Sequence, residues 1–79
     1  MRLTIDPRAN VAYLRFREKT VEVETIRVSE DVNVDLAPDG TVYGIELLNA
    51  KAQLAADPSG NLTLVNEASG ESCTIKLSA

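Results

Sequence analysis

Residues 31–48 read DVNVDLAPDGTVYGIELL, two runs in which apolar and polar residues alternate on either side of Pro38-Asp39-Gly40. Alternation with period two is typical of a β-strand that has one apolar and one polar face. Proline presets φ for an early turn position, and glycine accepts the positive φ that a later position often needs. This stretch therefore predicts a β-hairpin, around which we arrange the rest of the chain.

The length of the turn decides which side chains of this hairpin share a face. A three-residue loop sets Val34 against Gly44 and Val32 against Glu46. A loop with an even number of residues instead gathers one apolar set, namely Val32, Val34, Leu36, Tyr43, Ile45 and Leu47. Because a slip of one residue moves the apolar set of a strand to the other face, we expect the even loop. A bulge near Gly44 could reconcile the two registers.

Two more strands precede this hairpin. Residues 1–5 and 11–17 alternate around turn-forming residues, which predicts a first hairpin with Leu3 opposite Leu14 and Ile5 opposite Ala12. Residues 21–28 alternate as well, and we expect this strand to pair with residues 11–17. The pairs that this arrangement would form are Arg17 with Glu22, Arg15 with Glu24 and Phe16 with Val23. A change of apolar phase within the strand predicts a bulge near Glu24-Thr25.

The chain after Leu48 predicts one helix and two further strands. Asn49 is a good N-cap for a short helix over residues 50–56, which Asp57-Pro58-Ser59-Gly60 ends. Residues 62–65 and 73–77 alternate, so we expect a second hairpin, with a partly disordered tail as the alternative. The predicted fold is mainly β, on the border of α+β: an antiparallel β-meander of about five strands, one short helix and a C-terminal hairpin. Residues 1–56 form the meander core with the helix, and residues 57–79 extend the same domain as a hairpin.

The charge is −4, and it is unevenly distributed. Residues 1–27 carry six basic and four acidic side chains (+2), and residues 28–79 carry two basic and eight acidic ones (−6), which sum to −4. An acidic surface repels phosphate, so we expect no nucleic-acid partner, whereas a basic protein partner would fit. With few aromatic residues the core must be small and aliphatic, which favours a homodimer that extends it. No signal segment and no run of about 20 apolar residues is visible, so we expect a cytoplasmic protein without a membrane partner.

The residue types needed for common catalytic sites are missing. The chain has no histidine, which excludes Ser-His-Asp and Cys-His arrangements. Cys73 is the single cysteine, so no intrachain disulfide can form, and its place in an alternating strand predicts a buried apolar side chain. We therefore expect no enzymatic activity, no catalytic residue and no cofactor.

One acidic cluster remains as a candidate for metal binding. Asp31-x-Asn33-x-Asp35 begins like a calcium loop, but Leu36 and Val42 stand where an EF-hand needs Gly and Glu. On a strand, Asp31 and Asp35 would share a face, with Glu46 across from them. This acidic face could hold a divalent cation weakly, or it could simply be solvated. Glu46 could instead satisfy backbone groups or pair with an arginine such as Arg15, Arg17 or Arg27.

Several segments together resemble a known family. They are Ile5-Asp6-Pro7, AYLRF at residues 12–16, VNVD at residues 32–35, Asp39-Gly40 and VYGIELLNA at residues 42–50. Over residues 1 to about 54 the chain resembles the small bacterial family called domain of unknown function 2283. The resemblance implies no assigned activity. Some members are similar to proteins encoded beside candidate toxins, which implies an antitoxin-like partner role.

These observations lead to one expected function and two alternatives. We expect a small protein–protein interaction module, in its specific form an antitoxin-like partner of a neighbouring toxin, that uses its acidic face or a free strand edge. The first alternative is a structural homodimer without a separate partner. The second is a weak binder of a divalent metal or small ligand at the acidic face.

Overall fold

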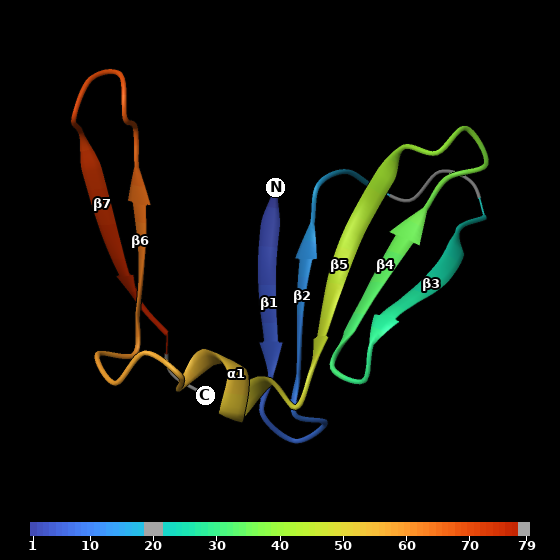
Figure 1. The fold of residues 1–79 in the computed structure, drawn as a ribbon, viewed down its shortest axis with the longest axis horizontal. Helices are drawn as coiled ribbons and strands as arrows, with labels where there is room; N and C mark the ends of the chain where they lie inside the picture. Colours follow the sequence, from blue (N-terminus) through green and yellow to red (C-terminus); the bar gives the residue numbers. More distant parts are fainter. Residues whose placement is uncertain (19–21, 78–79) are drawn as a thin grey trace.

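The computed structural model describes residues 1–18 and 22–77. Its elements, in chain order, are β1 (Arg2–Asp6), β2 (Val11–Arg15), β3 (Glu24–Ser29), β4 (Val32–Leu36), β5 (Val42–Leu48), α1 (Ala50–Leu54), β6 (Asn61–Val65) and β7 (Ser72–Lys76). All strand pairs are antiparallel. The predicted mainly β fold with one short helix and a C-terminal hairpin is confirmed (Figure 1).

The five-stranded sheet has the order β1-β2-β5-β4-β3, so β5 lies between the first hairpin and the rest of the meander. The predicted pairing of residues 21–28 with residues 11–17 is therefore wrong. Arg15 lies opposite Gly44, and Glu24 lies opposite Leu36. The exposed ion pairs that suggested the prediction stabilise by less than about 1 kcal/mol each. This small contribution is outweighed by the backbone hydrogen bonds and apolar contacts that β5 makes when it pairs with β2 on one side and β4 on the other. The strand was expected to begin at Val21, which lies outside the described residues.

The central hairpin has the register expected for the even loop. Val32 lies opposite Leu47 and Val34 opposite Ile45. The register then shifts, so that Leu36 pairs with Val42 and leaves Tyr43 as the extra residue of a β-bulge beside Gly44. In β3 the register shift falls between Arg27 and Ser29. The bulge predicted near Glu24-Thr25 is therefore wrong in its position, although the strand does contain one.

The first hairpin pairs as predicted, with Leu3 opposite Leu14 and Ile5 opposite Ala12. Strand pairing then gives the sheet two different faces. The apolar face carries the residues Leu3, Ile5, Ala12, Leu14, Ile26, Val32, Val34, Ile45 and Leu47. The polar face carries Thr4, Tyr13, Arg15, Thr25, Arg27, Asn33, Asp35, Gly44 and Glu46.

Helix α1 is shorter than expected and is capped differently. Asn49 occupies the predicted N-cap position, with φ 51°, but its side chain does not make the capping hydrogen bond expected of it. A distant asparagine takes this role. The Oδ1 atom of Asn10 accepts a hydrogen bond from the Lys51 N–H (2.8 Å), and the Asn10 carbonyl accepts one from the Ala50 N–H (3.0 Å). The start of the helix is thereby tied to the turn between β1 and β2.

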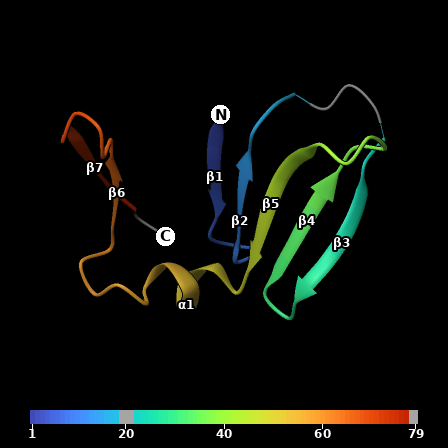
Figure 2. The ribbon, with the colours of Figure 1, turned by 45° about the horizontal axis from the view of Figure 1, so that its top comes forward.

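Strands β6 and β7 form the predicted C-terminal hairpin, with Leu62 opposite Ile75 and Leu64 opposite Cys73. Cys73 is exposed, so the prediction of a buried thiol is wrong; the hairpin has no second layer over it. The hairpin stands apart from the five-stranded sheet and is joined to it through α1, as two views show (Figures 1 and 2). Ala12, Tyr43 and Ala50 are the buried apolar residues among those described. Within residues 1–18 and 22–77, no helix has the length and apolar character needed to span a membrane.

Candidate functional site

The centre of the polar face is a hydrogen bond that joins two strands across a third. Tyr13 lies on β2 and Asp35 on β4, and β5 runs between them. The Tyr13 hydroxyl donates to Asp35 Oδ2 at 2.6 Å. The second carboxylate oxygen, Oδ1, accepts a hydrogen bond from the Thr25 hydroxyl on β3, also at 2.6 Å. One carboxylate therefore links β2, β4 and β3.

Gly44 on β5 makes this contact across the sheet possible. It lies opposite both Arg15 on β2 and Asp35 on β4. A Cβ atom added to Gly44 would lie 2.5 Å from the Tyr13 hydroxyl oxygen and 2.6 Å from two ring carbons. A strand glycine often marks a place where another group approaches the backbone closely. Here the tyrosine ring lies over the glycine backbone and reaches the next strand.

A second polar pair extends the cluster along the same face. Glu46 lies opposite Tyr13 on one side and Asn33 on the other. The Asn33 side-chain amide donates to Glu46 Oε1 at 3.0 Å. We call the residues Tyr13, Thr25, Asn33, Asp35, Gly44 and Glu46 the polar cluster.

The electrostatics of the cluster keep the phenol protonated. Burial of the hydroxyl, followed by its hydrogen bond to Asp35 and the negative charge of that carboxylate, raises the pKa of Tyr13 to about 12. The Arg15 guanidinium acts in the opposite direction, and its carbon lies 5.9 Å from the Tyr13 ring centroid. At neutral pH the phenol is a hydrogen-bond donor and a poor base. The protonated phenol can therefore keep its hydrogen bond to Asp35, which links β2 to β4.

Asp35 and Glu46 share the polar face of the sheet, as expected, but each carboxylate already accepts a hydrogen bond. Asp35 is engaged by Tyr13 and Thr25, and Glu46 accepts from Asn33, a partner that the sequence analysis did not consider. Asp31 precedes β4, where its backbone carbonyl accepts hydrogen bonds from the Leu48 N–H and the Gln53 side chain. In the described part of the chain no three acidic or cysteine side chains are grouped so that they could hold a metal ion.

Tyr13 and Gly44 belong to this site, although the sequence patterns did not single them out. Both residues carried a signal. An aromatic residue on the polar side of a strand and a glycine inside a strand each suggest a specific packing role. What joined them was the pairing of β2 with β5, which local patterns do not reveal.

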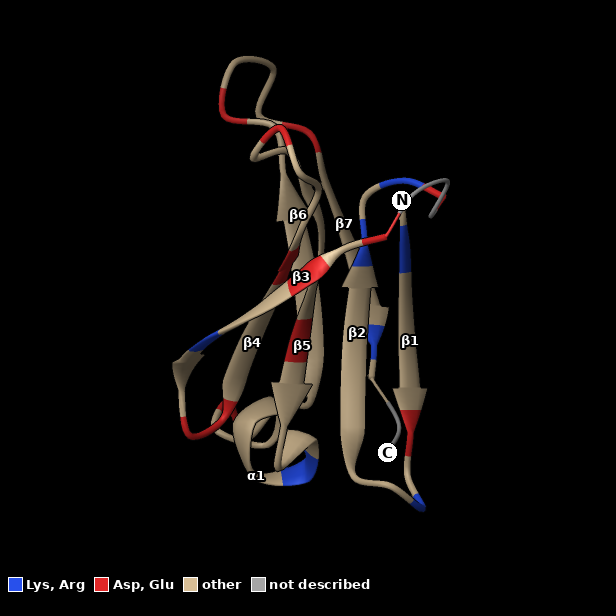
Figure 3. Ribbon diagram, turned by 90° about the vertical axis from the view of Figure 1, so that its right-hand side faces the viewer, with Lys and Arg blue, Asp and Glu red and all other residues tan. Residues whose placement is uncertain are grey.

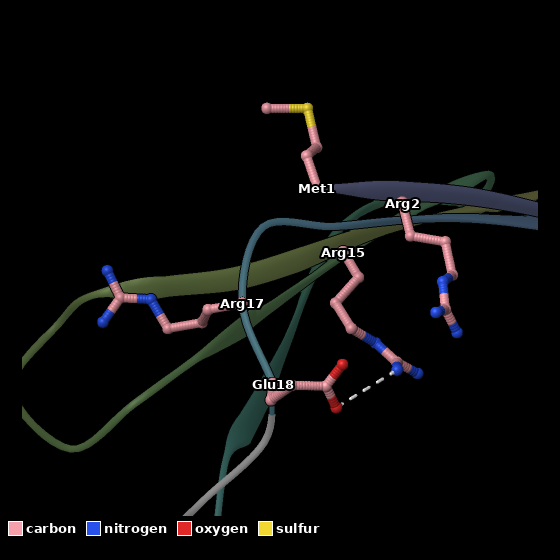
Figure 4. Close-up of a pocket in the computed structure, with 5 residues that line it drawn as sticks. All are labelled: Met1, Arg2, Arg15, Arg17 and Glu18. Atoms are coloured by element: carbon pink, nitrogen blue, oxygen red, sulfur yellow. Dashed lines mark ion pairs between the residues drawn. The ribbon is translucent and has the colours of Figure 1, made fainter.

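A shallow hollow of about 200 Å³ lies at the end of the sheet that contains the N-terminus. It is lined by Met1, Arg2, Arg15, Arg17 and Glu18 (Figure 4). Arg2, Arg15 and Glu18 lie on one side of the ribbon and Met1 on the other, and Arg15 Nη1 is 3.8 Å from Glu18 Oε2. Figure 3 shows basic residues at this end of β1 and β2, while acidic residues lie along β3, β4 and β5. The hollow is open, and Arg15 and Glu18 keep 42% and 80% of their side-chain surface exposed.

The fold and the polar cluster together define a class of protein. It is a small antiparallel sheet in a single layer, with hydrogen-bonded side chains on its polar face and an apolar face that is left uncovered. The chain belongs to the family described as protein of unknown function (DUF2283), whose model matches residues 2–51. The match includes the whole polar cluster and ends within α1, so β6 and β7 lie outside it. Neither the curated proteins nor the solved structures include a match to the chain.

Proposed function

We propose that this chain is a protein–protein interaction module and that the apolar face of its five-stranded sheet is the binding surface. One observation carries the proposal. In the described part of the chain, α1 contacts β2, but no second layer covers the apolar face: of its nine residues only Ala12 is buried, and Ile26 remains 39% exposed. Stable folds cover the apolar side of a sheet with another layer. An apolar face left open in the single chain is typical of a surface that a partner covers.

The chemistry of the two faces supports this choice of surface. The nine residues of the apolar face carry no ionisable group, so a partner can cover them without burying a charge. On the other side, the carboxylate of Asp35 is already satisfied by two hydroxyl donors. The polar cluster therefore links β2, β3 and β4 on the side opposite the binding surface. We propose this binding role without catalysis.

In its specific form the proposal is an antitoxin-like role toward the product of a neighbouring gene. The resemblance of residues 1–54 to the family suggested this role, and the acidic charge of −4 would favour association with a basic partner. Such charge speeds the encounter of two proteins more than it tightens the final complex. The affinity itself would come from the apolar face.

Calorimetric titration of the purified chain with the purified product of the adjacent gene tests this function. Ile26→Glu places a charge on the apolar face at edge strand β3, where the side chain is 39% exposed and the substitution is least able to disturb the fold. Arg27→Glu is the matched control, because it introduces the same residue on the opposite face of the same strand. We expect Ile26→Glu to weaken binding at least tenfold and Arg27→Glu to leave it within threefold.

The control also separates burial from net charge. Arg27→Glu changes the charge by two units and Ile26→Glu by one, so an effect of charge alone would be larger in the control. Far-UV circular dichroism of both variants checks that the sheet is intact. No binding at micromolar concentration would reject the antitoxin-like role, and equal weakening by both variants would reject the apolar face as the surface.

A further inference from the structure

The single chain exposes more surface than a compact protein of its size. Its accessible surface is 5882 Å², whereas a folded monomer of 8.5 kDa exposes roughly 4,700 Å². Its radius of gyration is 14.1 Å, against roughly 11.6 Å for a compact chain of this length. The excess is about 1,200 Å² per chain, or about 2,400 Å² for two chains, which lies in the range of obligate homodimer interfaces.

The C-terminal hairpin contributes a second uncovered apolar surface. Strand pairing places Leu62, Leu64, Cys73 and Ile75 on one side, and Leu64 and Ile75 are 70% and 52% exposed. The other side carries hydroxyl, amide and ammonium groups together with Val65. An isolated two-stranded hairpin is marginally stable in water, so this one needs a surface to pack against.

Hydrogen bonds order the segment that links the sheet to the hairpin. Helix α1 is fixed to the sheet by the hydrogen bonds of Asn10 with Ala50 and Lys51, and by the Gln53 side chain, which donates to the Asp31 carbonyl at 3.0 Å. The chain then makes a defined turn, in which Asp57 Oδ1 accepts from the Ser59 N–H at 2.9 Å. Figures 1 and 2 both show the hairpin beyond this turn and separate from the sheet.

We infer that the C-terminal hairpin of one copy packs its apolar side onto the apolar face of a second copy, and that the second copy does the same in return. The inference rests on the proposed function in that it takes the apolar face as an interaction surface, and it names a second copy of the chain, rather than the adjacent gene product, as what covers that face. Both surfaces are uncharged and apolar, and five-residue strands give them similar length. A reciprocal exchange of this kind has two-fold symmetry and closes after two copies. It gives each sheet the second layer that it lacks.

Analytical ultracentrifugation of the full chain tests the exchange. Leu64→Glu charges the apolar side of the hairpin, and Val65→Glu places the same charge on its other side, one residue away. Both side chains are more than half exposed in the single chain, at 70% and 54%. We expect the unaltered chain and Val65→Glu to sediment as dimers at 20 µM and Leu64→Glu to sediment as a monomer. Circular dichroism verifies that each variant retains the β-sheet spectrum.

Disulfide trapping identifies which surfaces meet. Cys73 is the single native cysteine and lies on the apolar side of the hairpin. A second cysteine is introduced by Leu3→Cys, Leu14→Cys or Ile26→Cys on the apolar face, with Thr4→Cys on the polar face as the control. We expect oxidation to yield a covalent dimer for at least one apolar position, above the amount that the unaltered chain and Thr4→Cys form.

The outcomes separate this inference from the proposed function. A chain that stays monomeric at all concentrations, or an internal disulfide that leaves a single-chain band, would overturn the exchange. So would a dimer that Leu64→Glu leaves intact. Leu64→Glu alters the hairpin and leaves the apolar face unchanged, so its effect on the dimer does not by itself decide whether the adjacent gene product binds. If the chain forms the hairpin-exchanged dimer but shows no heat of binding with the adjacent gene product, the antitoxin-like role is rejected and the dimer stands.

Discussion

The hydroxyl of Tyr13 lies 2.6 Å from Asp35 Oδ2, although the two residues belong to strands that are not neighbours. The contact crosses β5 at Gly44, the one strand residue between them that has no side chain. A hydrogen bond to a carboxylate is stronger than one between neutral groups. This bond therefore connects the first hairpin to the β3–β4 half of the sheet.

Removal of the Tyr13 hydroxyl should weaken the sheet. We expect Tyr13→Phe to lower the free energy of unfolding by about 1–2 kcal/mol, because the partly buried Asp35 carboxylate loses a donor. Urea denaturation gives this value. Tyr13→Phe in an Asp35→Asn background should have less than half of the effect. Equal effects in both backgrounds would show that the two groups are not coupled.

Stability should fall at alkaline pH because of the same hydroxyl. The fold raises the pKa of Tyr13 from 10.0 to about 12, so the folded state favours the neutral phenol. This contribution is complete below pH 10 and is lost as the pH rises from 10 to about 12. Urea denaturation between pH 9 and pH 11.5 should show a steeper loss for the unaltered chain than for Tyr13→Phe. Parallel curves would contradict the shift, and the difference in absorbance at 295 nm between the unaltered chain and Tyr13→Phe follows the Tyr13 phenolate, because Tyr43 contributes to both.

A side chain at residue 44 should displace the Tyr13 ring. The added Cβ of Gly44→Ala would lie 2.5 Å from the hydroxyl oxygen. Overpacking of this kind typically costs about 1–3 kcal/mol. We expect the cost to fall by more than half in a Tyr13→Ala background, where the ring is absent. Thermal unfolding of the unaltered chain, Gly44→Ala, Tyr13→Ala and the double variant measures this cost. If the cost of Gly44→Ala is the same in both backgrounds, the added methyl group does not clash with the Tyr13 ring.

Asn10 should stabilise α1 more than Asn49 does. Both residues have positive φ, 59° and 51°, so glycine fits the backbone at either position. Asn10→Gly removes the acceptor of the Lys51 N–H, and we expect it to destabilise the chain by about 1 kcal/mol. Asn49→Gly removes only a 3.4 Å contact with the Asn10 amide and should cost clearly less. Urea denaturation compares the two, and the reverse order would restore Asn49 as the cap.

Local sequence patterns were sufficient to predict the strand segments, the first, central and C-terminal hairpins, and the registers of the first and central ones. Alternation at residues 31–48 was sufficient to place Val34 against Ile45, because a strand that slips by one residue exposes its whole apolar side. Turn residues and side-chain period act over a few residues, so their effects can be read along the chain.

The order of the strands in the sheet could be seen only in the folded chain. The insertion of β5 next to β2 brought Tyr13 over Gly44 to Asp35, and it replaced the expected pairs of Arg15 and Glu24. It also gave α1 its cap from Asn10 rather than from Asn49. These partners are 22 to 41 residues apart in the chain. Contacts at such separation follow from which strands gain most by pairing, a choice made over the whole sheet that no local pattern records.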